Sequence, residues 1–145
     1  METSERVFAD SNYFVALFYP HDALHHQATI HANSIAKDNL HIITSSFVFL
    51  ETVTVLSQRA GRAVSREAGL YLRNNPFVTL LHIDEALGEK AWRIFQNTQD
   101  KNISFVDCST IAVMQAEHIT TLLTFDVTDF RKLRREYKFI FLHDA

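Results

Sequence analysis

Short, continuously apolar runs alternate with longer helical patterns along this chain of 145 residues. The runs Leu122-Leu123 and Phe139-Ile-Phe-Leu142 are examples of such strand-like segments. Strands that are apolar on both faces are typical of a parallel sheet buried between helices, because a sheet with one wet face would alternate apolar and polar residues. Strands that alternate with helices favour the same arrangement. The predicted fold is therefore α/β, a three-layer α/β/α sandwich with a mainly parallel central sheet.

The same patterns give approximate bounds for each element. Strands are expected at residues 7–10, 41–44, 77–83, 121–125 and 139–142. Helices are expected at residues 11–18, 21–37, 46–60, 64–73, 84–98 and 105–118, with Asp84 as an N-cap. The length suits one domain with its own core, and there is no internal repeat or low-complexity tract. A single domain spanning residues 1–145 is expected.

Composition excludes several classes of protein. Hydrophobic residues make up 47% and charged residues 21% of the chain, which is typical of a globular domain. No apolar run reaches membrane-spanning length, and the charged N-terminus does not resemble a signal peptide. The single cysteine, Cys108, fits a reducing cytoplasm. The net charge of −3 gives no global attraction to nucleic acid, so such binding would need local basic patches or a bound metal.

Four acidic residues stand beside or inside apolar segments that are expected to be buried: Asp10, Glu51, Asp107 and Asp126. Burying an unpaired carboxylate costs several kcal/mol or more, so such residues need compensation. Asp10 ends one predicted strand and Asp126 directly follows another, so both lie at strand carboxyl ends. Open parallel sheets bind ligands beyond these ends, where the strand order reverses. The set predicts a metal-binding acidic pocket at one edge of the sheet.

Each of these residues also has a purely structural interpretation. Asp10 and Asp107 are well placed to cap helices, and Asp126 to form a turn after a strand. Glu51 would need an exposed stripe on an otherwise apolar helix. Each interpretation is reasonable alone, but all four together are much less so, because all four residues can be placed at the same edge.

Taken in order, these acidic segments resemble the PIN domain, the nuclease fold of many VapC-type toxins, over nearly the whole chain. The segments are Phe8-Ala-Asp10-Ser-Asn-Tyr-Phe, Ser-Ser-Phe-Val-Phe-Leu-Glu51-Thr, Ser104-Phe-Val-Asp107-Cys-Ser-Thr and Leu123-Thr-Phe-Asp126-Val-Thr-Asp129-Phe130. One departure is Asn12, where the family often has a small hydroxyl residue. The last segment leaves open whether Asp126 or Asp129 supplies the fourth carboxylate, and Asp126 is favoured because it directly follows the strand.

The resemblance implies a metal-dependent endoribonuclease that hydrolyses RNA phosphodiester bonds, as the toxin of a toxin–antitoxin pair. It implies an RNA substrate, an antitoxin protein and a homodimer as partners. The catalytic and metal-binding residues would be Asp10, Glu51, Asp107 and Asp126, with Asp129 as the alternative to the last. The cofactor would be Mg²⁺ or Mn²⁺, which prefer hard oxygen ligands.

Further residues are expected to support this site. Asn12, Thr110 and Thr124 are candidate hydrogen-bond donors that would fix the carboxylates. A basic cluster follows the last acidic segment, and it is expected either to hold RNA phosphates or to form a solvated helix face. The cluster comprises Arg131, Lys132, Arg134, Arg135 and Lys138. The histidines at positions 21, 25, 26 and 31 lack cysteine partners and a His-Glu-x-x-His pattern, so they are expected at the surface.

Other α/β classes with acidic pockets fit less well. A phosphorylated receiver domain would need paired acids after the first strand and a Lys after the fifth, and this chain has neither. A haloacid-dehalogenase-like phosphatase would need an Asp at position 12, where this chain has Asn12. Two alternatives within the resembling family stay open: an RNA-processing nuclease that is not a toxin, and a non-catalytic RNA- or protein-binding module.

Overall fold

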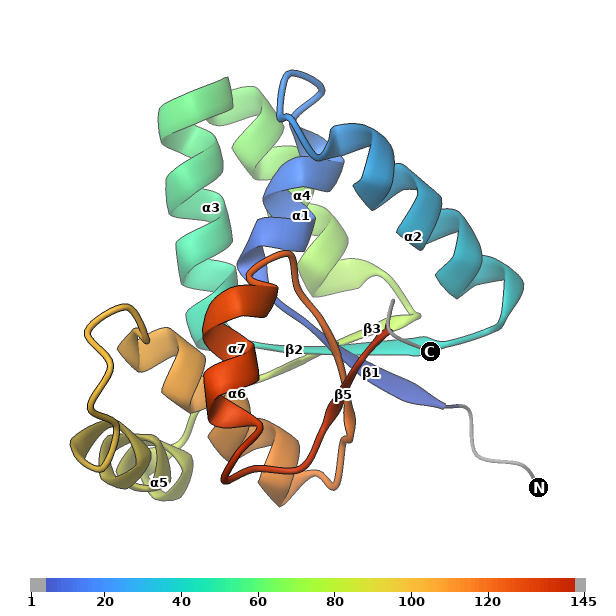
Figure 1. Cartoon of the computed structure of the whole chain (residues 1–145). Helices are drawn as coiled ribbons and strands as arrows, with labels where there is room; N and C mark the ends of the chain where they lie inside the picture. Colours follow the sequence, from blue (N-terminus) through green and yellow to red (C-terminus); the bar gives the residue numbers. More distant parts are fainter. Residues whose placement is uncertain (1–4, 143–145) are drawn as a thin grey trace.

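The computed structural model describes residues 5–142 and shows a five-stranded sheet between two layers of helices (Figure 1). The strand order is β3-β2-β1-β4-β5, and every neighbouring pair is parallel. The strands are β1 (Arg6–Ala9), β2 (His41–Ser45), β3 (Val78–Leu81), β4 (Thr121–Leu123) and β5 (Ile140–Phe141). The predicted three-layer sandwich with a parallel central sheet is confirmed.

Seven helices are described in residues 5–142. One layer contains α1 (Ser11–Phe18), α2 (His25–Lys37), α3 (Ser46–Ala60) and α4 (Arg62–Asn74), and α1 contacts the other three. On the other face, α5 (Glu85–Gln96) packs against α6 (Phe105–Ala116) (Figure 1). The short α7 (Val127–Leu133) connects β4 to the segment before β5. None of these helices is long and apolar enough to cross a membrane.

Two helices differ by more than two residues from the sequence-based expectation. Helix α2 begins at His25 rather than residue 21, because the preceding residues form a turn in which Asp22 Oδ1 accepts a 2.8 Å hydrogen bond from the Leu24 amide. Helix α7 was not expected at all. Only two of its residues, Phe130 and Leu133, are buried, and the charged residues around them hide this short pattern in the sequence.

Helix ends follow ordinary capping chemistry. Asp84 caps α5 as predicted, with its side chain accepting from the Leu87 amide. Helix α3 ends at Gly61, as predicted, and α4 begins directly after it at Arg62. Gly61 has a φ of +93°, a conformation that side chains disfavour, so glycine allows the abrupt change of direction between the two helices.

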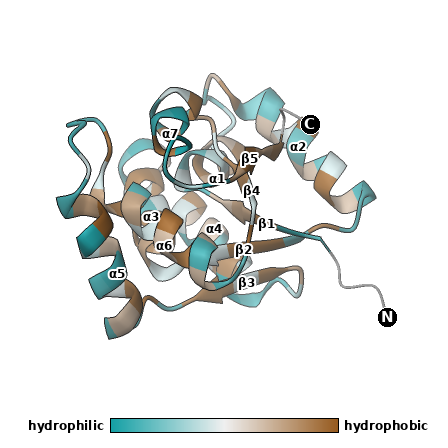
Figure 2. Ribbon diagram, turned by 60° about the horizontal axis from the view of Figure 1, so that its bottom comes forward, coloured by the Kyte–Doolittle hydropathy of each residue, from teal (hydrophilic) through white to brown (hydrophobic). Residues whose placement is uncertain are grey.

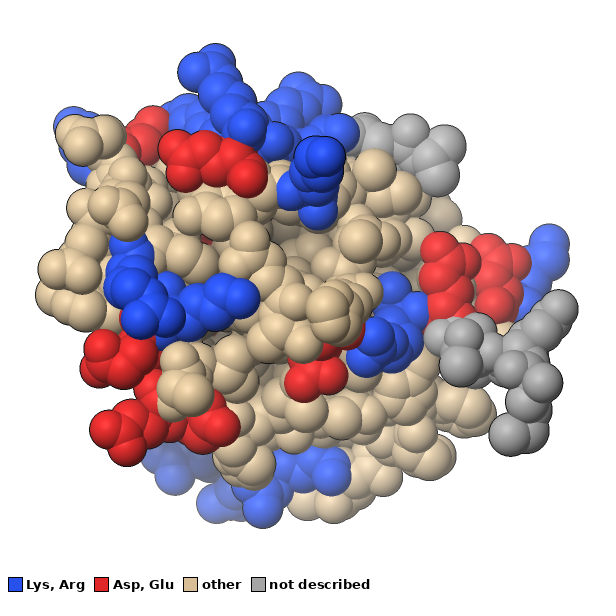
Figure 3. All heavy atoms as spheres, turned by 90° about the horizontal axis from the view of Figure 1, so that it is seen from below, with Lys and Arg blue, Asp and Glu red and all other residues tan. Residues whose placement is uncertain are grey.

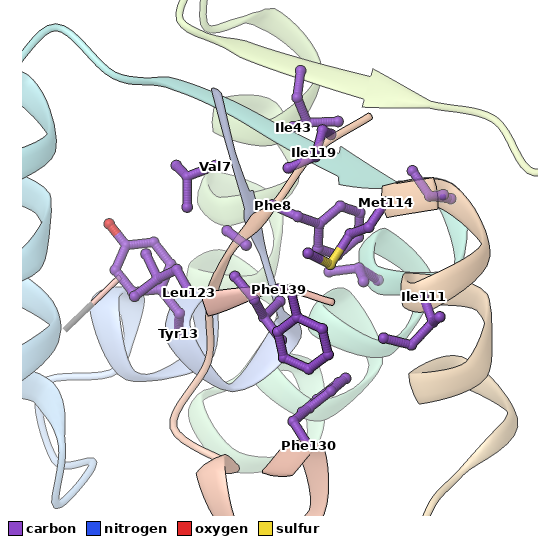
Figure 4. Packing of buried hydrophobic residues seen from close by; sticks show 14 of the residues in the cluster. Val7, Phe8, Tyr13, Ile43, Ile111, Met114, Ile119, Leu123, Phe130 and Phe139 are labelled. Carbon is purple, nitrogen blue, oxygen red and sulfur yellow. The ribbon is translucent and has the colours of Figure 1, made fainter. Parts of the chain in front are cut away.

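The core lies between the sheet and its helices, and the strands are its most hydrophobic part (Figure 2). In the close view of Figure 4, Phe8 of β1 lies near Met114 and Ile111 of α6, with Phe130 and Phe139 beyond them. Fully burying a side chain of this size contributes about 1.5–3 kcal/mol. This packing fixes the central strands against the helices that carry the acidic residues.

The strand order reverses between β1 and β4. The chain forms β1, β2 and β3 towards one edge, then returns to add β4 and β5 on the other side of β1. Ala9 is in register with Leu123, and the Asp10 amide donates to the Leu123 carbonyl at 3.0 Å. The residues that follow these two strands therefore leave the sheet side by side, at the position where such sheets bind ligands.

Candidate active site

Asp10 lies at the carboxyl end of β1, where it also caps α1. Its carboxylate accepts hydrogen bonds from the Ser11 amide at 2.8 Å and from the Thr124 hydroxyl at 2.9 Å. Its side chain is buried, with 4% of the residue exposed. Burial, with smaller contributions from the negative charges of Asp107 and Glu51, raises the pKa of Asp10 to about 7 against the lowering effect of the hydrogen bonds.

Asp107 lies in the first turn of α6. It forms a capping box with Ser104, in which the Ser104 amide donates to Asp107 Oδ2 at 3.0 Å and the Asp107 amide donates to Ser104 Oγ at 3.1 Å. Burial raises the pKa of Asp107 to about 6, and the charges of Asp126 and Glu51 act in the same direction. The expected N-cap at Asp107 is wrong, because Ser104 is the N-cap and Asp107 is the third helical residue. Asp107 still completes the capping box, and it also belongs to an acidic group.

Glu51 joins this group from α3. It is half-buried and accepts a hydrogen bond from the Ser11 hydroxyl. Its charge raises the pKa of both Asp10 and Asp107, so its carboxylate lies within electrostatic range of both. Helices α1, α3 and α6 and the link from β4 to α7 therefore bring the four predicted carboxylates to one edge of the sheet.

The closing acidic segment contains two carboxylates with different surroundings. Burial raises the pKa of Asp126, and the neighbouring Asp129 raises it further. Asp126 in turn raises the pKa of Asp107. Asp129 Oδ1 lies 3.4 Å from the Lys132 ammonium, which offsets its charge. Asp126 is thus coupled to the acidic group, whereas Asp129 is held by a cation of its own helix.

We expect Asp126→Asn to abolish RNA cleavage and Asp129→Asn to reduce it by less than about tenfold, as for removal of a supporting contact. The reason is that Asp126, and not Asp129, is among the carboxylates that raise the pKa of Asp107. Single-turnover cleavage rates of the two purified variants test this, once their melting temperatures show that both are folded. Full activity of Asp126→Asn together with an inactive Asp129→Asn would reverse the assignment.

Two of the three predicted supporting side chains contact the carboxylates. The Thr124 hydroxyl donates to Asp10 Oδ2 and accepts from the Asp126 amide at 3.0 Å. Asn12 Nδ2 lies 3.1 Å from Thr124 Oγ1 and 3.5 Å from Asp10 Oδ2. The expected contact of Thr110 is not formed: its buried hydroxyl has no hydrogen-bond partner among residues 5–142. Thr110 is a buried residue of α6 three positions after Asp107, and its hydroxyl does not reach the acidic group.

These two threonines form a matched pair for a test. We expect Thr124→Val to lower the rate of RNA cleavage about 10–100-fold, because it removes the donor that orients Asp10 and the acceptor for the Asp126 amide. We expect Thr110→Val to leave activity unchanged and stability equal or slightly higher, since it removes an unpaired buried hydroxyl. Equal activity of both variants would show that Thr124 does not position the site.

The predicted basic cluster is only partly available for phosphates. The Lys132 ammonium lies 2.6 Å from Asp100 Oδ2 and also pairs with Asp129, so it ties α7 to the loop before α6. The guanidinium of Arg134 lies 5.2 Å from the centre of the Phe141 ring. Arg131, Arg135 and Lys138 are exposed. On the face seen in Figure 3, basic and acidic side chains are interspersed.

Two of the four histidines expected at the surface are half-buried instead. His25 Nδ1 lies 2.7 Å from the Ala16 carbonyl, which joins α2 to α1. The ring of His31 lies 5.9 Å from that of Phe125, centre to centre. The first contact joins neighbouring helices, and the second joins residues far apart in the sequence.

The carboxylate oxygens suit a hard divalent cation such as Mg²⁺ or Mn²⁺. No basic residue is among the groups that shift the pKa of Asp10 or Asp107, whereas neighbouring carboxylates raise both. A bound cation would relieve this repulsion. Within residues 5–142, no three acidic, His or Cys side chains are already arranged as ligands of one ion. Asp10 and Asp107 instead turn towards hydrogen bonds with the backbone.

The sequence did not reveal two serines at this site. Ser11 donates its hydroxyl to Glu51, and Ser104 forms the capping box with Asp107. Ser104 carried a local signal, because a serine three residues before an acidic residue is typical of a capping box. Ser11 carried none, since its partner is 40 residues away in the chain.

The comparison with protein families assigns this chain to a known class. The PIN domain family model matches residues 7–136, which is most of the chain. The chain belongs to the PIN domain family. A curated relative, the 23S rRNA-specific endonuclease VapC20 of Mycobacterium tuberculosis, is 30% identical over 120 residues, covering 83% of this chain and 88% of VapC20.

Solved structures give the same result. The crystal structure of VapC20, described as a sarcin–ricin loop cleaving toxin, matches with a TM-score of 0.79 and 29% identity, covering 88% of this chain and 94% of that one. VapBC2 from Rickettsia felis, bound to a DNA fragment from its promoter, matches with a TM-score of 0.64 and 15% identity, covering 93% of this chain and 96% of that one. A toxin–antitoxin complex from Klebsiella pneumoniae matches with a TM-score of 0.60 and 15% identity, covering 86% and 89%. The last two show likeness of fold alone.

Proposed function

We propose that this protein is a metal-dependent endoribonuclease that cleaves structured ribosomal RNA as the toxin of a toxin–antitoxin pair. One observation carries the proposal: four carboxylates from separate elements, each within electrostatic range of another, lie beside the switch point of a PIN fold. The chain that forms this fold is 30% identical to a 23S rRNA-specific endonuclease. The substrate class comes from that relative. Ribosomal RNA as the target would place the activity in the cytoplasm.

The residues of the chain divide the chemistry among them. Asp10, Asp107 and Asp126 would hold Mg²⁺ or Mn²⁺, with Glu51 either orienting the attacking water or holding a second ion. A bound divalent cation lowers the pKa of a bound water and offsets charge on the phosphate and the leaving oxygen. Thr124 and Ser104 keep Asp10 and Asp107 in place through their hydrogen bonds. Exposed Arg131 and Arg135 are available to contact flanking phosphates.

The direct test is incubation of the purified protein with intact ribosomes, free 23S rRNA and a panel of unrelated structured RNAs. Each reaction is run with Mg²⁺, with Mn²⁺ and with chelator, and cleavage positions are mapped by primer extension. We expect metal-dependent cleavage at one position in ribosomal RNA. Cleavage of the panel without ribosomal preference would favour the RNA-processing alternative. Binding without cleavage in either metal would favour a non-catalytic module.

Exposed apolar residues near the site support the proposed protein partners. A hollow of about 530 Å³ beside Glu51 is lined mainly by apolar side chains, and it suits an antitoxin segment with an apolar residue and a basic residue. Those lining residues are Phe47, Leu50, Glu51, Thr54, Val55, Phe105 and Val106. The neighbouring Trp92 and Phe95 stack on each other at the surface and suit a homodimer. Helix α1, in contrast, is mostly buried by its neighbours.

Separate variants test the two partners. We expect Leu50→Glu to weaken co-purification of a co-expressed antitoxin, and Trp92→Lys to lower the solution mass from dimer to monomer. Light scattering at micromolar concentration gives the mass. An exposed residue of α4, Leu70, provides the control, because Leu70→Lys alters a comparable apolar residue elsewhere. A monomeric wild type that captures no antitoxin would contradict the toxin assignment and favour a solitary nuclease.

A further inference from the structure

A second pocket lies on the α2 side of the link between β4 and α7, the segment that carries Asp126. It has a volume of about 400 Å³ and is lined by Leu24, Gln27, His31, Phe125 and Val127. Two of these, Phe125 and Val127, are the direct neighbours of Asp126 in the chain. A ligand held there would therefore lie beside the segment that carries the Asp126 carboxylate.

The lining suits a flat, neutral heteroaromatic ring rather than a phosphate. None of the five residues carries a carboxylate, an ammonium or a guanidinium. The rings of Phe125 and His31 lie 5.9 Å apart at an angle of 45°, so they present two tilted aromatic surfaces. The amide of the exposed Gln27 both donates and accepts hydrogen bonds, as recognition of a base edge requires. Proteins that recognise unpaired RNA combine aromatic stacking with hydrogen bonds of this kind.

The pocket and the carboxylates are fixed by the same hydrogen bonds. The Phe125 amide donates to Asn12 Oδ1 at 3.0 Å, and Asn12 also contacts Thr124. Thr124 in turn holds Asp10 and the Asp126 amide. Phe125 is therefore placed relative to the acidic group by a rigid network, so a base in the pocket and a phosphate at the carboxylates would have a fixed relative position.

We propose that this pocket binds the base of a nucleotide that flanks the scissile phosphate and so selects the cleavage position. The inference depends on the proposed ribonuclease function and adds a determinant of specificity to it. An apolar side chain from a protein partner is a different occupant, which the test separates. The base is favoured because the pocket flanks the segment that carries Asp126 and offers an amide beside its aromatic rings.

The test pairs changes in the RNA with changes in the protein. A sarcin–ricin-loop RNA is prepared with an abasic site at each nucleotide flanking the mapped cleavage position. We expect one abasic site to lower kcat/KM of the wild type about 5–150-fold, the range for loss of one stacked base. In Phe125→Leu, which retains an apolar side chain, and in Gln27→Ala, the same abasic site is expected to change kcat/KM less than in the wild type.

Matched controls and an independent signal make the outcome decisive. Phe77→Leu and Gln96→Ala change exposed residues outside the pocket and should keep the full effect of the abasic site. With 2-aminopurine at the same nucleotide, binding should quench fluorescence in the wild type but less in Phe125→Leu, even in chelator without cleavage. Equal effects of the abasic site in all folded proteins, or no quenching at any loop position, would overturn the pocket assignment.

Failure of this inference is distinguishable from failure of the proposed function. A wild type that cleaves ribosomal RNA at one position, yet shows no coupling between base and pocket, would support the proposed function and contradict the pocket assignment. A wild type that neither cleaves RNA nor quenches 2-aminopurine fluorescence would contradict both proposals. Loss of antitoxin capture in Phe125→Leu, with unchanged RNA coupling, would assign the pocket to a protein side chain instead.

Discussion

Asp10→Asn is expected to lower the single-turnover rate of RNA cleavage by about 10²–10⁴-fold, because the charge stabilisation that a catalytic cation provides is worth several kcal/mol. Asp10 is the most deeply buried member of the acidic group, at the end of β1 beside the strand-order reversal. Asparagine keeps the shape and one acceptor oxygen, so the Ser11 amide retains a partner. The loss of activity would then come from the missing charge rather than from unfolding.

Glu51→Gln and Asp107→Asn are expected to be similarly inactive. In each, the amide oxygen can still accept the observed hydrogen bond, from Ser11 in one case and from the Ser104 amide in the other. Asp84→Asn is the matched control, since Asp84 is also an acidic helix cap but is exposed and lies at the start of α5. It should retain the wild-type rate. Full activity of a folded Asp10→Asn protein would refute the metal-site assignment.

Much of the fold was predictable because its signals are local. Continuous apolar runs predicted parallel strands, and Gly61 and Asp84 predicted the helix ends that are observed. The position of Asp10 beyond β1 also followed from this local pattern. Helix α7 was missed because its apolar side has only two buried residues, Phe130 and Leu133, among charged ones.

The interactions within the site were less predictable, because they join residues far apart in the chain. Lys132 looked like a phosphate contact in a basic run, yet Asp100, brought close by the loop before α6, pairs with it. Thr110 and Thr124 looked equivalent in sequence, and only the fold shows that the second reaches Asp10. The pocket that His31 and Phe125 help to line forms where α2 lies near the end of β4.

The capping roles of Asp10 and Asp107 explain how an acidic group persists in a folded protein without a cation. Each carboxylate accepts a backbone N–H at the start of a helix, where the helix dipole also favours negative charge. These contacts lower the pKa of both groups, but burial and mutual repulsion outweigh them. The remaining imbalance makes stability depend on pH and on metal.

Asp10→Asn is also expected to stabilise the metal-free protein near neutral pH. The pKa of Asp10 is about 7 in the folded protein against an ordinary value of 3.8. Between these values the folded state holds more protons than the unfolded state, so the free energy of unfolding falls as pH rises from about 4 to 7. The full loss is on the order of 4 kcal/mol at 1.36 kcal/mol per pKa unit. Replacing Asp10 with asparagine removes this pH-dependent loss of stability.

Chemical denaturation in chelator, at a series of pH values, measures the effect. The variant and the wild type should have similar stability near pH 4.5, and the variant should become more stable as pH approaches 7.5. Asp107, with a pKa of about 6, should give a smaller rise that is complete at lower pH. Asp84→Asn again controls for the loss of one negative charge. A difference between variant and wild type that does not change with pH would contradict the raised pKa.

Divalent metal should narrow this difference in stability. A cation that binds only the folded state adds RT ln(1 + [L]/Kd), or about 2.7 kcal/mol at a hundredfold excess over Kd. Millimolar Mn²⁺ should therefore raise the melting temperature of the wild type at pH 7.5 and change that of Asp10→Asn much less, because one ligand and its charge are missing. The wild-type gain should shrink near pH 5, where protons compete for Asp10 and Asp107. Equal rises in melting temperature in both proteins would show that the metal binds elsewhere. No rise in either would show that Asp10 acts only as a buried helix cap.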